Sequence, residues 1–446
     1  MVGLVFHEVG NFPVNRLELE GVLANIHLFR VSLLPSRTVE RRVASSNLTR
    51  PNNHSISRVI EVIRTHREVN RRLIARETGL STPSITRLVN ELILADILSV
   101  SESATAEGAG PGRPASVVKL NRNYCCAIGV DVGEHAIQLA LGDMGGNIQL
   151  TSRLSSDADQ GSNATFSNIV QSIESIRKLH ESNFDAEAPP LRAITVGVPG
   201  TVDPDSSRVV MAPKIKDWTN FDLKEQLEAR IPDVKIRIVN DINAAAIGES
   251  AHGVARGYDD FVFVSIRRGI GAGIFIGGKL HQGHSGFAGE MGKMVFDSSF
   301  RFSDSEGIGH LESICGEDPL LRQAKERGIK LSSTDLLKPQ LNLLSLAAAN
   351  GDEGAIEILK EFLTKYGVAI ANIASLLDPP IIVVGGEIRP VMDMAVEHLS
   401  KTVGKLIPSP PKIIGSSLGE QAILQGTFYQ AHRDACDTML ACQTVL

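Results

Sequence analysis

Short apolar runs alternate with helix-like segments from Tyr124 onward, and this alternation constrains the fold most. Three runs, at 127–132, 136–141 and 148–150, follow one another closely, as the strands of an antiparallel meander do. Further strands are expected at 193–198, 235–239, 261–266, 273–276 and 381–384, with helices at 169–180, 243–251 and 354–377. Strands interleaved with helices in this order predict an α/β domain of two lobes.

A shorter segment with helical periodicity precedes this region. Apolar residues recur at helical spacing over 56–63 and predict a first helix. Asn70 can cap a second helix that ends at Gly79, and Ser81 can cap a third with Pro83 in its first turn. Two helices joined by a glycine-containing turn are typical of a helix-turn-helix, with a plain three-helix bundle as the alternative.

The third helix favours the helix-turn-helix, because its exposed face carries small hydroxyl residues and an arginine instead of Glu–Lys pairs. The glycine-rich segment 107–114 and the apolar residues after it predict a β-hairpin wing, with a solvated linker as the open alternative. The recognition helix would enter the major groove and the wing tip the minor groove. The residues expected to contact DNA are Ser81, Thr82, Ser84, Thr86, Arg87 and Arg113.

Charge is distributed unevenly along the 446 residues, whose net charge is −6. Residues 1–50 carry six basic and four acidic residues (+2), and 51–122 carry ten and seven (+3), so 123–446 carries −6 − 2 − 3 = −11. A mildly basic front on an acidic body suits a small DNA-binding head on a larger sensor or enzyme. Five cysteines without a Cys-x-x-Cys pair, and no apolar run near the roughly 20 residues that cross a bilayer, predict a cytoplasmic protein without a membrane span.

These patterns divide the chain into four parts. Residues 1–52 show no clear period and are expected to be disordered or to reflect an incorrectly assigned translation start, with an extra helix on the head as the alternative. A winged helix-turn-helix is expected over 53–122, an effector domain over 123–435 and a C-terminal tail over 436–446.

Glycine-containing motifs stand at the ends of the expected strands. Asp131-Val-Gly133, Gly269-Ile-Gly271-Ala-Gly273 and Gly385-Gly386 are candidate phosphate loops, and each is weak alone. Their order, together with Gly197-Val-Pro199-Gly200, Asn240-Asp241 and Gly286-Phe-Ala-Gly-Glu290-Met-Gly292, resembles the ROK family of repressors and sugar kinases. The resemblance extends over roughly 53–430, including Ser81–Arg87 of the head and the Gly-Arg-Pro that follows it. It implies a two-lobed actin-like (ribonuclease H-like) ATPase fold behind the winged helix-turn-helix.

The resemblance also implies a sugar pocket. In the family's kinases the aspartate of the Asn-Asp pair takes a proton from the attacking sugar hydroxyl, and the asparagine holds the sugar. Asp241 matches that base, with an N-cap aspartate as the alternative, and Glu290 and Glu312 match carboxylates that accept sugar hydroxyls, with surface glutamates as the alternative. The sugar-binding residues expected on this basis are Gly200, Asn240, Asp241, Glu290, Lys293 and Glu312.

Departures from the family's pattern argue against ATP turnover. Where the kinases have Asp-x-Gly-Gly-Thr-Lys, this chain has Asp131-Val-Gly133-Glu134-His135-Ala136, which places a carboxylate where phosphate oxygens should approach. The second loop, Gly-Thr-Gly in the kinases, is Arg267-Arg268-Gly269, although these arginines could themselves attract phosphate. The loops expected to be degenerate comprise Asp131, Gly133, Gly269, Gly271, Gly385 and Gly386, so no catalytic residue is expected, or Asp241 if the protein is a kinase.

The zinc site common in the family is also altered. Its histidine position is Lys293, and its three cysteine positions fall on Ser303, Ser305 and His310. Zinc requires thiolate or imidazole donors, so no metal is expected. With ATP binding disfavoured by the altered phosphate loops, no other cofactor is expected either.

Two hypotheses from different classes follow. The first is a sugar-responsive regulator, a repressor of a carbohydrate uptake or catabolic operon, which binds operator DNA as a homodimer or tetramer. The second is an ATP-dependent, glucokinase-like sugar kinase with an appended head, and the altered first phosphate loop favours the regulator. Lys293 adds a cation to the pocket and suggests an anionic sugar.

Overall fold

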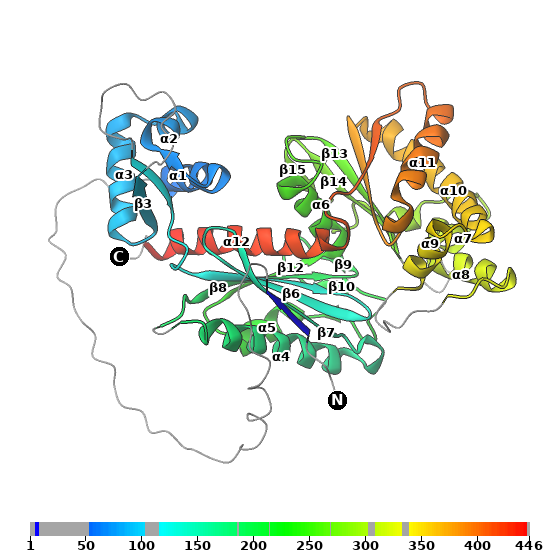
Figure 1. Cartoon of the computed structure of the whole chain (residues 1–446), viewed down its shortest axis with the longest axis horizontal. Coiled ribbons are helices and arrows are strands. Elements are labelled where there is room, and N and C mark those ends of the chain that lie inside the picture. The colour runs from blue at the N-terminus through cyan, green and yellow to red at the C-terminus, as the bar shows by residue number, and fades with distance from the viewer. Residues whose placement is uncertain are drawn as a thin grey trace, which may run out of the picture.

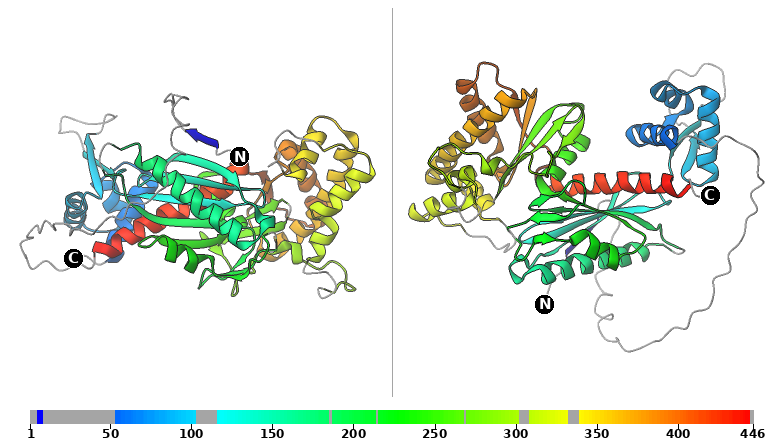
Figure 2. Two further views of the ribbon diagram at one scale, coloured as in Figure 1. Left: turned by 90° about the horizontal axis from the view of Figure 1, so that it is seen from below. Right: turned by 180° about the vertical axis from the view of Figure 1, so that it is seen from behind.

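The computed structural model describes residues 5–8, 53–102, 116–184, 187–213, 215–267, 269–301, 308–331 and 339–443. A small head and two α/β lobes are joined by the long helix α12 (Ala422–Gln443), which runs from the second lobe across the first lobe to the head (Figure 1). The view from behind in Figure 2 shows the same arrangement.

The head contains α1 (Asn53–His66), α2 (Arg71–Thr78) and α3 (Thr82–Leu94), with a sheet of β2 (Val69–Asn70), β4 (Ser116–Leu120) and β3 (Leu98–Glu102). The expected caps are confirmed: the Asn70 side chain accepts from the Leu73 N–H, Gly79 has φ 66°, and the Ser81 side chain accepts from the Ser84 N–H. Strands β3 and β4 pair antiparallel, as a wing requires. The wing tip at 103–115, with Arg113, lies outside the described residues.

The first lobe is built on a six-stranded sheet in the order β1-β7-β6-β5-β8-β12. The meander β5 (Cys126–Val132), β6 (Ala136–Asp143) and β7 (Ile148–Ser155) is antiparallel, whereas β8 (Leu191–Val198) and β12 (Lys235–Asn240) run parallel to β5. Helices α4 (Ser162–Glu181) and α5 (Leu223–Arg230) cover one face, and α12 covers the other (Figure 1). A small sheet of β9 (Thr201–Val202), β10 (Val209–Met211) and β11 (Thr219–Phe221) extends this lobe.

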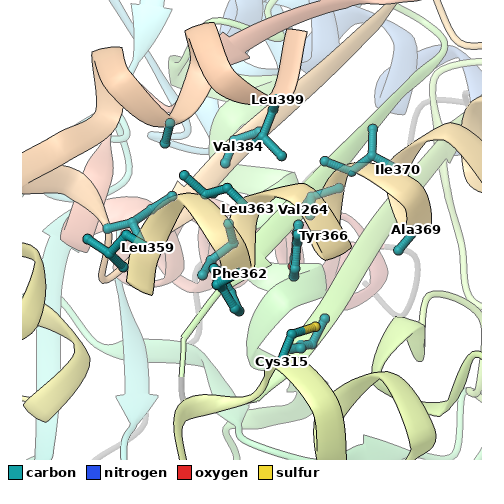
Figure 3. Packing of buried hydrophobic residues seen from close by; sticks show 14 of the residues in the cluster. Val264, Cys315, Leu359, Phe362, Leu363, Tyr366, Ala369, Ile370, Val384 and Leu399 are labelled. Carbon is teal, nitrogen blue, oxygen red and sulfur yellow. The ribbon is translucent and has the colours of Figure 1, made fainter. Parts of the chain in front are cut away.

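The second lobe has the strand order β15-β14-β13-β16-β17. Strand β13 (Phe261–Ile266) pairs antiparallel with β14 (Ile270–Ile276) and parallel with β16 (Ile381–Gly386). In its core, side chains of β13 and β16 face α10 (Glu353–Leu377) and α11 (Met392–Leu406), and the Tyr366 hydroxyl donates to the Ser265 carbonyl oxygen at 2.8 Å (Figure 3). The remaining elements are α6 (Asp241–His252), α7 (His310–Cys315), α8 (Glu317–Glu326), α9 (Gln340–Ala349), β15 (Lys279–His281) and β17 (Lys412–Gly415).

Helix α12 packs unusually closely on α6. A Cβ atom at Gly426 would clash with the Ala244 carbonyl oxygen, and one at Gly248 would clash with the Ala422 carbonyl oxygen. Further along α12, Tyr429 contacts both the end of α6 and the head. Its ring centroid lies 5.6 Å from that of His252, and the Arg64 guanidinium carbon lies 5.0 Å from the ring centroid.

Two terminal segments differ from expectation. Residues Val5–Glu8 form strand β1, which pairs antiparallel with β7, so this part of the 1–52 extension adds a strand to the first sheet. Helix α12 continues through Cys436, which is buried, so the segment expected to begin a tail at 436 is helical as far as Gln443. The reason is packing: Ala431, Ala435 and Cys436 belong to an apolar cluster shared by the head and the first lobe. None of the described helices is long and apolar enough to cross a membrane.

Candidate functional site

The candidate site between the two lobes, which we call the cleft, comprises Asp131, Asp241, Arg267 and Glu387 at the carboxyl ends of parallel strands from both sheets. Asp131 lies near the end of β5, and Asp241 directly follows β12. Arg267 and Glu387 directly follow β13 and β16, whose last residues, Ile266 and Gly386, are paired in register. Because α/β folds bind their ligands at the carboxyl edge of parallel strands, these strand ends define the candidate site.

Asn240 is engaged by the protein at both ends of its amide. Its Oδ1 accepts from the backbone N–H groups of Ile242 and Asn243, both at 2.9 Å, which caps α6. Its Nδ2 donates to the Gly200 carbonyl oxygen at 2.9 Å. A Cβ atom at Gly200 would clash with Met211, so only glycine allows this close approach. Asn240 therefore positions the Gly200 loop against α6, and it is Asn240, not Asp241, whose side chain caps the helix.

Asp241 begins α6 and is buried. Its Oδ1 accepts from the Ile242 N–H at 2.9 Å, and its Oδ2 lies 3.4 Å from Nη1 of Arg267. The carboxylate thus faces the second lobe from the end of the first sheet.

Glu290 interacts electrostatically with Lys293, Asp241 and Glu312. The Thr201 hydroxyl donates to Oε1 of Glu290 at 3.2 Å. Burial raises the pKa of Glu290; Lys293 lowers it, and Asp241 and Glu312 raise it further. Asp241, Lys293 and Glu312 each interact with Glu290, so these four expected sugar-binding residues form one electrostatic cluster.

The glycines of the expected phosphate loops have packing roles here. Gly133 N–H donates to the Ala136 carbonyl oxygen at 2.9 Å and closes the β5–β6 hairpin. A Cβ at Gly271 or Gly273 would clash with Ile242 or Ala246 of α6. The remaining glycines lie at strand ends of the second sheet. The Gly269 carbonyl oxygen accepts from the Arg267 N–H, and a Cβ atom at Gly385 would clash with the Phe263 ring. Gly386 has φ 107°, and a Cβ atom there would clash with Ile266.

Arg267 is the cleft residue whose role the sequence did not reveal. The sequence marked it as a departure from the kinase loop that could itself attract phosphate, whereas the structure places it among three carboxylates. Besides Asp241, it pairs with Glu387, whose Oε1 lies 3.6 Å from its Nε. Burial raises the pKa of Asp131 to about 6, Arg267 opposes the rise, and Asp241 adds to it. Arg268 lies outside the described residues.

The loop that carries the zinc positions is held by other contacts. His310 Nδ1 accepts from the Phe296 N–H at 3.0 Å, and its ring stacks on Phe300 with centroids 4.6 Å apart. Lys293 offers a cation instead of a metal donor, and Ser303 and Ser305 lie outside the described residues. No group of three or more His, Cys, Asp or Glu side chains that could hold a metal occurs in the described parts of the chain, and the residues present do not fit zinc.

The expected DNA-contacting residues of α3 lie at its N-terminal end. Ser81 and Ser84 share a hydroxyl contact at 2.9 Å, and the Thr86 hydroxyl donates to the Thr82 carbonyl oxygen at 2.9 Å. Arg87 Nε lies 3.9 Å from Oε1 of Glu91, one turn later. Thr82 and Thr86 are exposed, and Arg87 is half-buried, so this surface presents hydroxyl groups and one guanidinium.

The chain is similar to both transcription regulators and sugar kinases. The chain is 28% identical over 360 residues to the xylose repressor of Bacillus subtilis (strain 168), covering 79% of this chain and 88% of that protein. It is 28% identical over 344 residues to the transcriptional dual regulator NagC of Escherichia coli (strain K12), covering 74% and 79%. It is 31% identical over 316 residues to a glucokinase of Streptomyces coelicolor, covering 67% and 95%.

Solved structures give the same result for the fold. A ROK family transcriptional regulator, described as a homologue of the E. coli MLC protein, superposes with a TM-score of 0.71 at 22% identity, covering 88% of this chain and all of that one. A ROK family glucokinase from Streptomyces griseus, in complex with glucose and AMPPNP, superposes with a TM-score of 0.57 at 27% identity, covering 69% and 99%. Residues 127–434 match the ROK family, and the chain therefore belongs to it.

Proposed function

We propose that the protein is a sugar-responsive, DNA-binding transcription regulator that acts as a repressor. The observation that carries this proposal is the helix-turn-helix head packed on the ROK domain. Repressor relatives align over 79% of the chain, whereas the glucokinase aligns over 67% of the chain while using 95% of its own length. A kinase that is matched over nearly its whole length thus leaves about a third of this chain unmatched, which favours a regulator with a head in addition to a kinase-like body.

In this proposal the effector pocket comprises Asp241, Glu290 and Glu312, with Asn240 and Gly200 shaping its wall. Carboxylates accept hydrogen bonds from sugar hydroxyls, and Asp241 and Glu290 already lie in one cluster. A ligand that binds them better in one state of the cleft than in another would shift the protein between these states.

The charges favour a neutral sugar over the anionic sugar that Lys293 suggested. Lys293 lowers the pKa of Glu290, and Arg267 forms ion pairs with Asp241 and Glu387. Both cations therefore have carboxylate partners, and an anionic ligand would have to compete with them. Among the described residues of the cleft, two cations, Arg267 and Lys293, face the carboxylates of Asp131, Asp241, Glu290, Glu312 and Glu387.

The test is operator binding by the full chain, titrated with a panel that includes xylose, N-acetylglucosamine, glucose and their phosphate and uronate derivatives. We expect one neutral sugar to change operator affinity by about 5–150-fold, the usual range of allosteric coupling. A protein that binds no DNA fragment of its own genome in any condition contradicts the proposal.

A sugar kinase remains the second candidate, because Asp241 is retained at the position of the catalytic base. A coupled assay of ADP release with the same sugars separates the two. Turnover at an ordinary enzymatic rate, above about 1 per second, would favour the kinase.

The assembly and the compartment are part of the same proposal. Palindromic operators are read by two-fold symmetric proteins, so we infer a homodimer or tetramer, to be measured by light scattering on the free protein. Binding to DNA implies a cytoplasmic location. The buried, unbridged cysteines Cys125, Cys126, Cys315 and Cys436 suit a reducing compartment.

A further inference from the structure

The centre of the cleft contains a guanidinium surrounded by carboxylates from both lobes. Arg267 Nη1 lies 3.4 Å from Oδ2 of Asp241, and its Nε lies 3.6 Å from Oε1 of Glu387. Asp131 is near enough for Arg267 to lower its pKa. The side chains of Arg267, Asp241 and Glu387 are 29%, 12% and 11% exposed, so these charges interact in a largely desolvated space.

The main chain holds this cluster in place. The Glu387 N–H donates to the Ile266 carbonyl oxygen at 2.8 Å, which locks the residue after β16 to the end of β13. Asp131 and Asp241 come from the opposite sheet and from the start of α6. The guanidinium therefore stands between the two lobes, and it interacts with carboxylates on both sides of the cleft.

Three carboxylates in a desolvated site need a cation. Each like-charged neighbour and each lost water molecule disfavours ionisation, so burial and Asp241 raise the pKa of Asp131. Asp131 is 3% exposed, and its Oδ1 has no hydrogen-bond partner among the described residues. In a phosphoryl-transfer enzyme such a requirement is met by a divalent cation that arrives with the nucleotide. This chain meets it with its own side chain.

We propose that Arg267 is an internal counter-ion that takes the place of a divalent cation between Asp131, Asp241 and Glu387, and so excludes the metal-bound nucleotide from the cleft. The residues of the cleft then do not fit magnesium with ATP, because a fixed guanidinium already occupies the space between the oxygen ligands. Burial alone would lower the pKa of Arg267, but Asp131, Asp241 and Glu387 together raise it, so this cation is permanent. The two lobes would be held together electrostatically without a cofactor, which leaves the sugar as the ligand that acts on the cleft.

This inference concerns the cleft alone and depends on neither the operator nor the identity of the sugar. Removing the guanidinium should leave a site of hard oxygen ligands, which Mg²⁺ and Mn²⁺ prefer. The experiment compares the full-length wild type with Arg267→Ala by calorimetric titration with Mn²⁺ and by melting temperature with and without millimolar Mg²⁺. The matched control is Arg256→Ala, which removes an exposed arginine of the same lobe.

We expect the wild type and Arg256→Ala to bind Mn²⁺ at least tenfold more weakly than Arg267→Ala. We also expect Arg267→Ala to melt at a lower temperature and to recover with Mg²⁺. If this variant does not fold, Arg267→Ala combined with Asp131→Asn removes one carboxylate with the cation, and this pair should melt above the single variant or fold where it does not.

Two results would overturn the proposal. One is an Arg267→Ala protein that binds Mn²⁺ no better than the wild type. The other is a wild-type protein whose melting temperature rises with inorganic phosphate in an Arg267-dependent way, because Arg267 would then be a receptor for anions instead of a counter-ion.

Discussion

Among single residues, Asp131 makes the protein's stability depend on pH. Its pKa of about 6 in the folded protein exceeds the ordinary value of 3.8. A group whose pKa rises on folding contributes most below its unfolded pKa, and this contribution is lost as pH rises through the folded pKa. Between pH values of about 4 and 6 the free energy of unfolding should therefore fall, by about 3 kcal/mol at most from this group.

Asp131→Asn is the test, because asparagine retains the shape and cannot ionise. The gain in melting temperature of this variant over the wild type should be larger at neutral pH than near pH 4. Glu290→Gln provides the comparison, since burial also raises the pKa of Glu290. An equal gain at both pH values would mean that folding leaves the pKa of Asp131 unchanged.

The effector response should depend on the carboxylates of the pocket. Asp241→Asn and Glu290→Gln are expected to bind operator DNA with near wild-type affinity but to lose most of the sugar response, because only differential affinity shifts a conformational equilibrium. The measurement is operator binding with increasing effector, and Asp205→Asn, an exposed carboxylate of the first lobe, is the control. A full response in both pocket variants would remove Asp241 and Glu290 from the effector site.

For single residues, the sequence predicted which side chains belong to the candidate site but not which groups they contact. Asp241 and Glu290 were identified from motifs because each stands at a fixed offset within a local pattern. The pairing of Arg267 with Glu387 depends on the parallel register of β13 and β16, which brings together residues 120 positions apart. No local pattern encodes that register. The hydrogen bond from the Asn240 side chain to the Gly200 carbonyl oxygen could likewise not be predicted, since Gly200 lies 40 residues away.

Among the elements, α3 should carry the DNA specificity. Arg87→Ala should weaken operator binding by about 1–3 kcal/mol if the guanidinium contacts a base edge, and the loss should be uniform across sequences if it contacts phosphate. Glu91→Ala should leave binding unchanged or improve it, because Glu91 pairs with Arg87 in the free protein. Gel-shift titrations at two salt concentrations separate the base contact from the phosphate contact. Wild-type binding by Arg87→Ala would indicate that another surface reads the DNA.

The loop around His310 should not depend on zinc. The His310 ring accepts a backbone hydrogen bond and stacks on Phe300, so it is held without a metal. We expect well under one zinc ion per chain by elemental analysis and a melting temperature that chelators leave unchanged. Stoichiometric zinc would show that ligands outside the described residues complete a site.

Elements with strong local signals were predicted well. The caps of α2 and α3 are those that the sequence indicated, because capping depends on neighbours within one turn. Strand β1 was not foreseen, since a four-residue edge strand is defined by its partner and not by its own pattern. Helix α12 was not foreseen either, because Ala431, Ala435 and Cys436 are buried by the head and the first lobe and form no pattern of their own.

In the whole molecule, the contact of α6 with α12 should govern both stability and regulation. Gly426→Ala places a methyl group against the Ala244 carbonyl oxygen, so the helices must separate. We expect a destabilisation of about 1–3 kcal/mol, the usual cost of overpacking, measured by denaturant unfolding. Gly404→Ala is the matched control: it lies in α11 with nothing within 4 Å of the added Cβ, and should stabilise by about 0.5–1 kcal/mol. Equal stability in both variants would contradict the close packing.

Tyr429 should couple the pocket to the head. It contacts His252 at the end of α6 and Arg64 in α1 of the head. Tyr429→Ala is expected to bind both operator and sugar while losing much of the coupling between them, whereas Tyr258→Ala, on the exposed surface, should behave as wild type. The measurement is the ratio of operator affinities with and without sugar, and an unchanged ratio in Tyr429→Ala would exclude this route.

Helix α6 begins at Asp241 in the cleft and ends at His252 beside Tyr429, so its 12 residues form a rod about 18 Å long between the pocket and the contact to the head. A rod of that length converts a tilt of a few degrees at one end into a shift on the order of 1 Å at the other, comparable to helix shifts at allosteric interfaces. The number of residues in α6 would then determine how a movement at the pocket is transmitted to the head. One inserted residue would turn the two ends by about 100° relative to each other. The pocket and the head could each remain intact, yet they would no longer face the partners through which one acts on the other.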